Sequence, residues 1–100
     1  FSHLRFEDLP ASAVHAARRY VLDALGCGLA GWNTEKGRLA AEVMIDQGGH
    51  PTSQILGSPV KVSPGGAAFA NAELINALDF DALPHTPPVT LPALLATAQA

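Results

Sequence analysis

The sequence predicts an all-α fold with one short hairpin or extended loop around residues 51–62. Three observations support this prediction. Apolar residues recur at helical spacing on both sides of this stretch, glycine and proline separate the helical segments, and residues 51–62 alone change to short extended runs. With 48% apolar and 15% charged residues, the composition is that of a globular protein with a core, and differs from that of a disordered tail.

The first helix is expected from Ala11 to about Ala30, after Pro10, because a first helical turn tolerates proline. Its apolar stripe consists of residues three or four positions apart: Val14, Ala17, Val21, Leu25 and Leu29. The run Gly26-Cys-Gly-Leu-Ala-Gly31 closes this helix, and each glycine costs about 1 kcal/mol against alanine inside a helix. Either another helix approaches closely at these glycines, or the helix ends early.

Capping residues mark the second helix. Asn33 and Thr34 are good N-caps for a helix over Glu35–Gln47, which Gly48-Gly49 then stops. The following residues 51–62 contain two short extended pieces around a Gly-Ser-Pro turn, as expected for a small hairpin or extended loop.

Proline marks the remaining helices. Ser63-Pro64 starts a third helix, which runs to Asp79 and is expected to be buried because its apolar residues are mainly small. Three prolines between residues 84 and 88 are expected to prevent regular helix there. The fourth helix is therefore expected to begin near Thr90 to Pro92.

The charge of the chain argues against nucleic acid and membranes as main partners. A net charge of −3, with six Lys and Arg spread along the chain, provides no basic stripe for nucleic acid and no polybasic segment for a membrane.

The single cysteine, Cys27, cannot form an intrachain disulfide, which favours a cytoplasmic location. Phe1 is no initiator methionine and the last helical run has no stop signal, so we expect a part of a longer protein.

A polar cluster follows the third helix and enters the proline-rich loop: Asn76, Asp79, Asp81 and His85. If the backbone leaves the helix at Asp79, the two carboxylates face the same way and His85 can reach the same pocket. A carboxylate and an imidazole together suit proton transfer. The alternative is that the aspartates end the helix through Asx-type turns and that His85 is an ordinary loop residue. Two aspartates and one histidine are a thin metal-ligand set, so we expect no metal, although a metal-binding module is a third possibility.

Several stretches of the chain resemble the MmgE/PrpD family. The matching runs, in chain order, are Leu9-Pro10, Val21-Leu-Asp-Ala-Leu-Gly26, Leu29-Ala-Gly31, Ala67-Ala-Phe-Ala-Asn71, Ala77-Leu-Asp-Phe-Asp81, His85 and Leu91-Pro-Ala-Leu-Leu-Ala96. They resemble the family's opening helix, its AAFAN…HALDFDD stretch and its HPG…PALLA segment. Order and spacing agree over nearly the whole chain, while proteins of the family are several times longer.

The resemblance implies a large helical domain and a smaller mixed lid domain, with residues 1–100 forming the N-terminal portion of the helical domain. Family members include 2-methylcitrate dehydratase, cis-aconitate decarboxylase and iminodisuccinate epimerase, which are typically homodimers without a metal–sulfur cluster. They act on small di- or tricarboxylates by proton transfer next to a carboxylate. The resemblance therefore implies a parent enzyme that is a hydro-lyase, decarboxylase or epimerase without a cofactor, whereas these 100 residues alone are expected to be inactive.

The same resemblance implies catalytic roles for Asp79 and His85 and substrate-binding roles for Asp81 and Asn76. The lysines and the further histidine that would complete the site are expected in other parts of the parent. The sequence also departs from the family pattern, because Asn76 stands where histidine is frequent, Ala82 replaces the second aspartate and the loop to His85 is shorter. These departures motivate the alternative of a non-catalytic helical assembly or dimerisation segment from an inactive family member.

Overall fold

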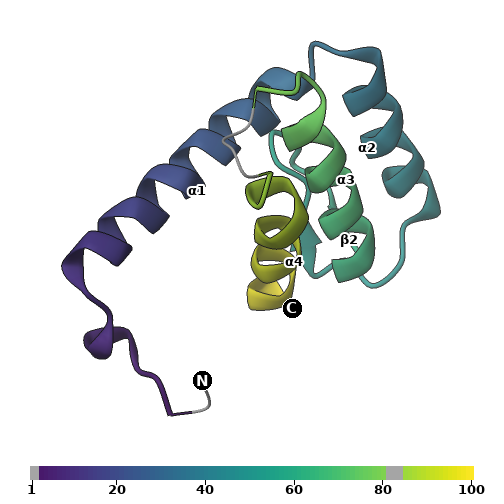
Figure 1. Ribbon diagram of the computed structural model, residues 1–100. Helices are drawn as coiled ribbons and strands as arrows, with labels where there is room; N and C mark the ends of the chain where they lie inside the picture. The colour runs from purple at the N-terminus through teal and green to yellow at the C-terminus, as the bar shows by residue number, and fades with distance from the viewer. Residues whose placement is uncertain (1–2, 81–84) are drawn as a thin grey trace.

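The computed structural model describes residues 3–80 and 85–100. Its elements, in order, are the 3-10 turn η1 (Phe6–Asp8), α1 (Ala11–Gly31), α2 (Glu35–Gln47), β1 (Ser53–Gln54), β2 (Lys61–Val62), α3 (Pro64–Asn76) and α4 (Pro87–Gln99). Helix α3 lies at the centre and packs against α1, α2 and α4 (Figure 1). The predicted all-α fold is confirmed, and the hairpin is present as an antiparallel pair in which Ser53 faces Val62 and Gln54 faces Lys61.

The glycines at the end of α1 allow close helix packing. A Cβ placed on Gly31 would collide with the backbone carbonyl of Leu74 in α3, and a Cβ on Gly37 would collide with the carbonyl of Gly31. A Cβ added at Gly28 would lie 3.0 Å from the side chain of Leu56, whereas a Cβ on Gly26 would have open space. Of the two interpretations of this glycine run, close approach is therefore correct, and helix α1 continues through it to Gly31.

Caps fix the start of α2 and α3 as predicted. The Thr34 hydroxyl accepts a hydrogen bond from the Gly37 amide at 3.0 Å, and the Ser63 hydroxyl accepts one from the Gly66 amide at 3.2 Å. Each hydroxyl satisfies one of the amide donors that a helix leaves unpaired at its N-terminus. The bounds of α2, Glu35–Gln47, agree with the predicted range.

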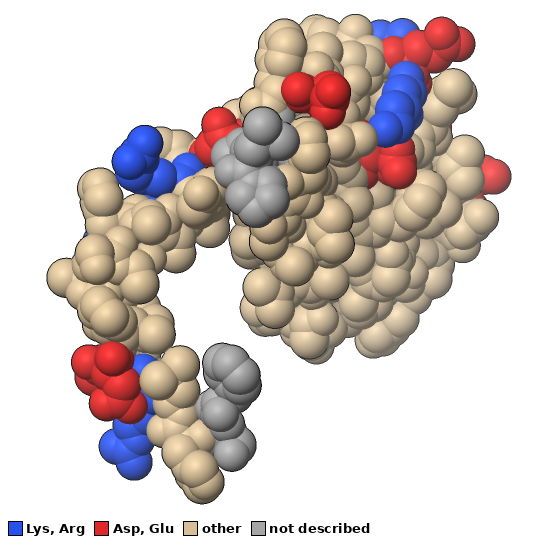
Figure 2. Space-filling view, viewed as in Figure 1, with Lys and Arg blue, Asp and Glu red and all other residues tan. Residues whose placement is uncertain are grey.

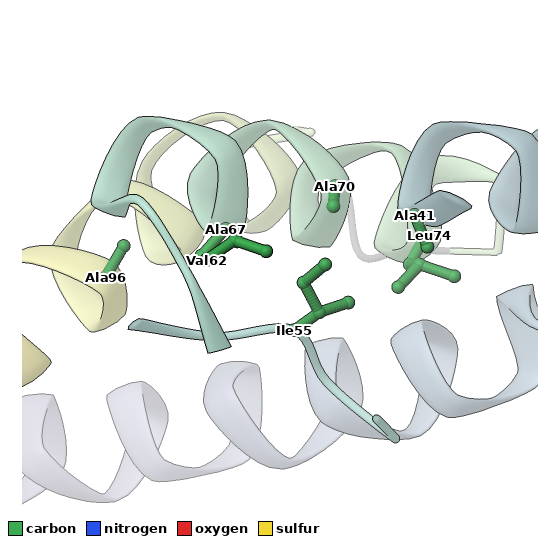
Figure 3. Close-up of a cluster of buried hydrophobic side chains, with 7 residues drawn as sticks. All are labelled: Ala41, Ile55, Val62, Ala67, Ala70, Leu74 and Ala96. Atoms are coloured by element: carbon green, nitrogen blue, oxygen red, sulfur yellow. The ribbon is translucent and has the colours of Figure 1, made fainter. Parts of the chain in front are cut away.

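The core is built mainly from small and branched apolar side chains around α3. Its buried members come from α2, the hairpin segment, α3 and α4: Ala41, Ile55, Val62, Ala67, Ala70, Leu74 and Ala96 (Figure 3). One buried polar residue, Asn71, joins α3 to the hairpin segment, because its side chain accepts from the Leu56 amide at 2.8 Å and donates to the Gln54 carbonyl at 3.1 Å. Since strands of two residues have little stability of their own, these bonds hold the segment against α3.

The predicted start of α4 is wrong. The helix begins at Pro87, and Pro87 and Pro88 occupy its first two positions, where the backbone amides have no partner within the helix. Proline there loses no hydrogen bond, and its fixed φ already suits a helix. The carbonyl of Thr86 accepts from the amides of Val89 and Thr90 and so starts the helix, which continues through Pro92.

The N-terminal half of α1 extends away from the other helices (Figure 1). Exposed apolar side chains lie along this part of the chain, with Phe6 of η1 at 65%, Tyr20 at 45% and Leu22, just past the middle of α1, at 72%. None of the helices that the structure describes has both the length and the apolar character needed to cross a lipid bilayer. The face shown in Figure 2 is largely uncharged, and its few basic groups are scattered over it.

Candidate functional site

The end of α3 determines where Asp79 lies. The helix ends at Asn76, three residues earlier than predicted, and the carbonyl of Asn76 accepts a hydrogen bond from the Asp79 amide at 3.0 Å. Asp79 has φ of 55°, the one positive φ among the non-glycine residues that the structure describes. This left-handed conformation is unfavourable for most side chains, but aspartate adopts it more readily than most. The chain therefore turns sharply at Asp79 as it leaves the helix.

The structure brings two of the predicted site residues together. The Asp79 Oδ1 atom lies 4.0 Å from the His85 Nε2 atom, so the carboxylate at the end of α3 faces the imidazole just before α4. The side chains are 81% and 46% exposed, respectively. An exposed pair of this kind adds only about 0.2–1 kcal/mol to the stability of the fold. Its possible importance is therefore in proton transfer. A carboxylate that orients an imidazole is a common arrangement for moving a proton at neutral pH.

Of the other two predicted site residues, Asn76 lies among the described residues and Asp81 does not. Asp81 lies outside the described residues, as do Ala82 and the rest of the loop up to Pro84. Asn76 is partly buried in the last turn of α3, and its side-chain oxygen accepts a hydrogen bond from the Lys36 ammonium at 3.2 Å. Its backbone carbonyl supports the turn at Asp79, so Asn76 connects a cation to the candidate pair.

Sequence reasoning missed Lys36. This residue lies in the first turn of α2, and its ammonium group also pairs with Glu73 of α3 at 3.0 Å. No local signal in the sequence identifies it, because Lys36 and Asn76 are 40 positions apart and meet only when α2 packs against α3. Lysine residues on exposed helix faces are common, so only the packing distinguishes this one.

An apolar groove between α1 and α4 begins one residue after His85. Its lining residues come from both helices and from the residue that precedes α4: Ala17, Tyr20, Val21, Thr86, Pro87, Thr90, Leu91 and Leu94. A second apolar hollow lies along the exposed surface of α1 and η1 and includes Phe6, Leu9 and Leu22. The first hollow has no charged residue in its lining and the second has one, Arg18, so the candidate acid–base chemistry stays with the Asp79–His85 pair.

Metal binding finds little support in the described geometry. Among residues 3–80 and 85–100, no three His, Cys, Asp or Glu side chains gather closely enough to hold a metal ion. Asp81, which belongs to the ligand set considered from the sequence, lies outside these residues. The metal-binding alternative therefore stays a prediction.

Comparison with known proteins identifies the family of this chain. The sequence model described as the MmgE/PrpD N-terminal domain matches residues 1–100. A cis-aconitate decarboxylase-like protein, oryM, of Aspergillus oryzae is 31% identical over 98% of this chain, and the cis-aconitate decarboxylase of Homo sapiens is 32% identical over 97% of it. The chain spans 21% of the length of each relative, and no solved structure matches. This chain therefore belongs to the MmgE/PrpD family, whose N-terminal domain it matches from residue 1 to residue 100.

Proposed function

We propose that this chain contributes an acid–base pair, Asp79 and His85, to an enzyme that moves a proton next to a carboxylate of a small di- or tricarboxylate. The observation that carries the proposal is the 4.0 Å approach of the two side chains between α3 and α4. Family membership and two relatives with cis-aconitate decarboxylase in their names support this reaction class. Dehydration, decarboxylation and epimerisation of such substrates share this proton transfer.

We infer a different role for each of the two residues. His85 is the group that would accept or deliver the proton, because an imidazole changes its charge near neutral pH. Asp79 would orient the imidazole and stabilise its charged form, since an opposite charge favours imidazolium. The anionic substrate also needs cationic groups to hold it and to stabilise developing charge, and these would come largely from parts of the parent enzyme beyond these residues.

The test is an assay of the full-length protein that contains this chain, with cis-aconitate and 2-methylcitrate as substrates. His85→Gln and Asp79→Asn each remove one function and keep the side-chain size, and asparagine also tolerates the left-handed conformation at position 79. General acid–base catalysis typically contributes about 10²–10⁴-fold, so we expect kcat to fall by about 100-fold or more for His85→Gln.

Matched controls separate this effect from a general loss of charge. His50→Gln and Asp46→Asn alter an exposed histidine and an exposed aspartate in and near α2, away from the pair. We expect both control variants to retain wild-type kcat. If His85→Gln were as active as His50→Gln, the acid–base role of this pair would be refuted.

A second function, a non-catalytic assembly segment, is favoured by the exposed apolar side of α1. Apolar side chains that gather on one surface frequently mark an interface between proteins. Leu22 is 72% exposed within this surface, while Leu39 on α2 is 52% exposed and lies outside it. Under this proposal, Leu22→Arg dissociates a homodimer of the full-length protein in sedimentation experiments and Leu39→Arg does not, while the variants at Asp79 and His85 change nothing measurable.

A further inference from the structure

A single lysine connects α2 to the turn that carries Asp79. The Lys36 Nζ atom lies 3.0 Å from Oε2 of Glu73 and 3.2 Å from Oδ1 of Asn76, both on the last two turns of α3. The last turn of α3 contains no basic residue of its own. A positive charge near a helix C-terminus is favourable because the terminal carbonyls carry partial negative charge. Lys36 therefore supplies from α2 the cation that α3 lacks.

The position of Lys36 is fixed by the residue that follows it. Gly37 is buried and lies against the carbonyl of Gly31, and an added Cβ there would also meet the Leu74 side chain at 3.0 Å. At this point α2 is in contact with both α1 and α3, so the backbone of Lys36 has little room to move. The Lys36 side chain is half exposed, but it extends towards α3 from a backbone segment that is held in place.

The connection continues from Asn76 to Asp79. The Asn76 side chain accepts from Lys36, and its backbone carbonyl accepts from the Asp79 amide at 3.0 Å. Asp79 at φ of 55° needs such support, because a non-glycine residue keeps this conformation only where its surroundings hold it there. A shift of Asn76 would therefore displace the Asp79 carboxylate relative to His85.

We propose that Lys36 is a positioning residue for Asp79 and acts through Asn76. The proposal rests on the proposed function, which places Asp79 in the active site. Lys36 holds the last turn of α3, this turn fixes the left-handed turn at Asp79, and Asp79 in turn orients the His85 imidazole. Lys36 itself does not touch the reacting atoms in this scheme.

The test uses three variants of the full-length protein. Lys36→Met removes the charge and keeps the apolar stem, and Lys36→Arg restores a cation that can reach Glu73 and Asn76. Arg38→Met removes a different exposed cation from the same helix and serves as the control. Two quantities are measured: kcat and KM on the accepted substrate, and hydrogen exchange at the Asp79 amide, which reports the bond to the Asn76 carbonyl.

We expect Lys36→Met to lower kcat about 10-fold or more with KM nearly unchanged, because a small displacement of a catalytic group costs rate more than binding. In the same variant, hydrogen exchange at the Asp79 amide becomes at least several-fold faster. Lys36→Arg restores most of the wild-type kcat and exchange rate, and Arg38→Met changes neither quantity. Asn76→Leu removes the acceptor, and a Lys36→Met/Asn76→Leu double variant should be little worse than either single variant.

Two results would overturn the inference. Unchanged amide exchange at Asp79 in Lys36→Met would show that Lys36 does not hold this turn, whatever the activity. Additive losses in the double variant would show that Lys36 and Asn76 act separately. Failure of the proposed function can be told apart from failure of this inference. Even if the protein turns over no carboxylate, amide exchange at Asp79 still shows whether Lys36 holds the turn.

Discussion

The crossing of α1 and α3 at Gly31 provides a sharp test of the packing. In Gly31→Ala, the new Cβ would collide with the Leu74 carbonyl oxygen and lie 2.9 Å from the carbonyl carbon. These atoms belong to the backbone of a buried helix and cannot rotate away. Overpacking of a core costs about 1–3 kcal/mol, and a collision with backbone belongs at the upper end, about 3 kcal/mol. Alanine regains about 1 kcal/mol of helix propensity, which leaves a net loss of about 2 kcal/mol.

Gly26→Ala is the matched control, because it makes the same chemical change in the same helix. A Cβ at Gly26 has no atom within 4 Å, so only the helix propensity acts and the variant should gain about 0.5–1 kcal/mol. The two variants should therefore differ by about 3 kcal/mol in the free energy of unfolding. With an m-value of about 2 kcal/mol per molar urea, this difference separates their midpoints by about 1.5 M.

The assay is urea unfolding followed by the fluorescence of Trp32, which lies next to Gly31 and donates its indole hydrogen bond to the Leu56 carbonyl at 2.7 Å. This signal therefore reports the region that the substitution disturbs. Midpoints for Gly31→Ala and Gly26→Ala that agree within error would refute the close approach of the two helices.

Three further stability predictions use the same assay. Asn71→Ala leaves the Leu56 amide and the Gln54 carbonyl without their buried partner and should cost about 2–4 kcal/mol, so a loss below 1 kcal/mol would contradict the role of Asn71. Thr34→Ala removes the N-cap of α2 and should cost about 1 kcal/mol; an unchanged midpoint would show that the cap contributes nothing. Asp79→Val places a β-branched residue at positive φ and should cost about 1–2 kcal/mol, whereas Asp79→Asn should be nearly neutral; equal midpoints for the two would argue against the left-handed turn.

Local signals predicted most of the helices correctly. Thr34 and the glycine pair at residues 48 and 49 gave the correct bounds for α2, because a cap and a stop act on neighbouring backbone groups. The start of α4 was predicted incorrectly for a physical reason. Proline disrupts a helix only where its missing amide would have been bonded, and Pro87 and Pro88 lie in the first turn, where it would not.

The candidate site was less accessible to sequence reasoning. The pairing of Asp79 with His85 was anticipated because the two residues lie close together along the chain. The left-handed turn at Asp79 was not, since it depends on α3 ending at Asn76. Lys36 and Asn71 were missed because their partners lie on distant segments, and only tertiary packing decides which polar side chains meet.

The close helix crossing also has a mechanical consequence for α1. With 21 residues and a rise of about 1.5 Å per residue, α1 is a rod of about 30 Å whose fixed end lies at Gly31 and whose other end projects outward (Figure 1). A tilt of only about 5° at the glycine contact displaces the far end by about 3 Å. This displacement is about as long as the donor–acceptor distance of a hydrogen bond. The close packing of Gly28 and Gly31 thus sets the direction in which the exposed apolar side of α1 points, and the position of a dye attached at Ser12 would report that direction.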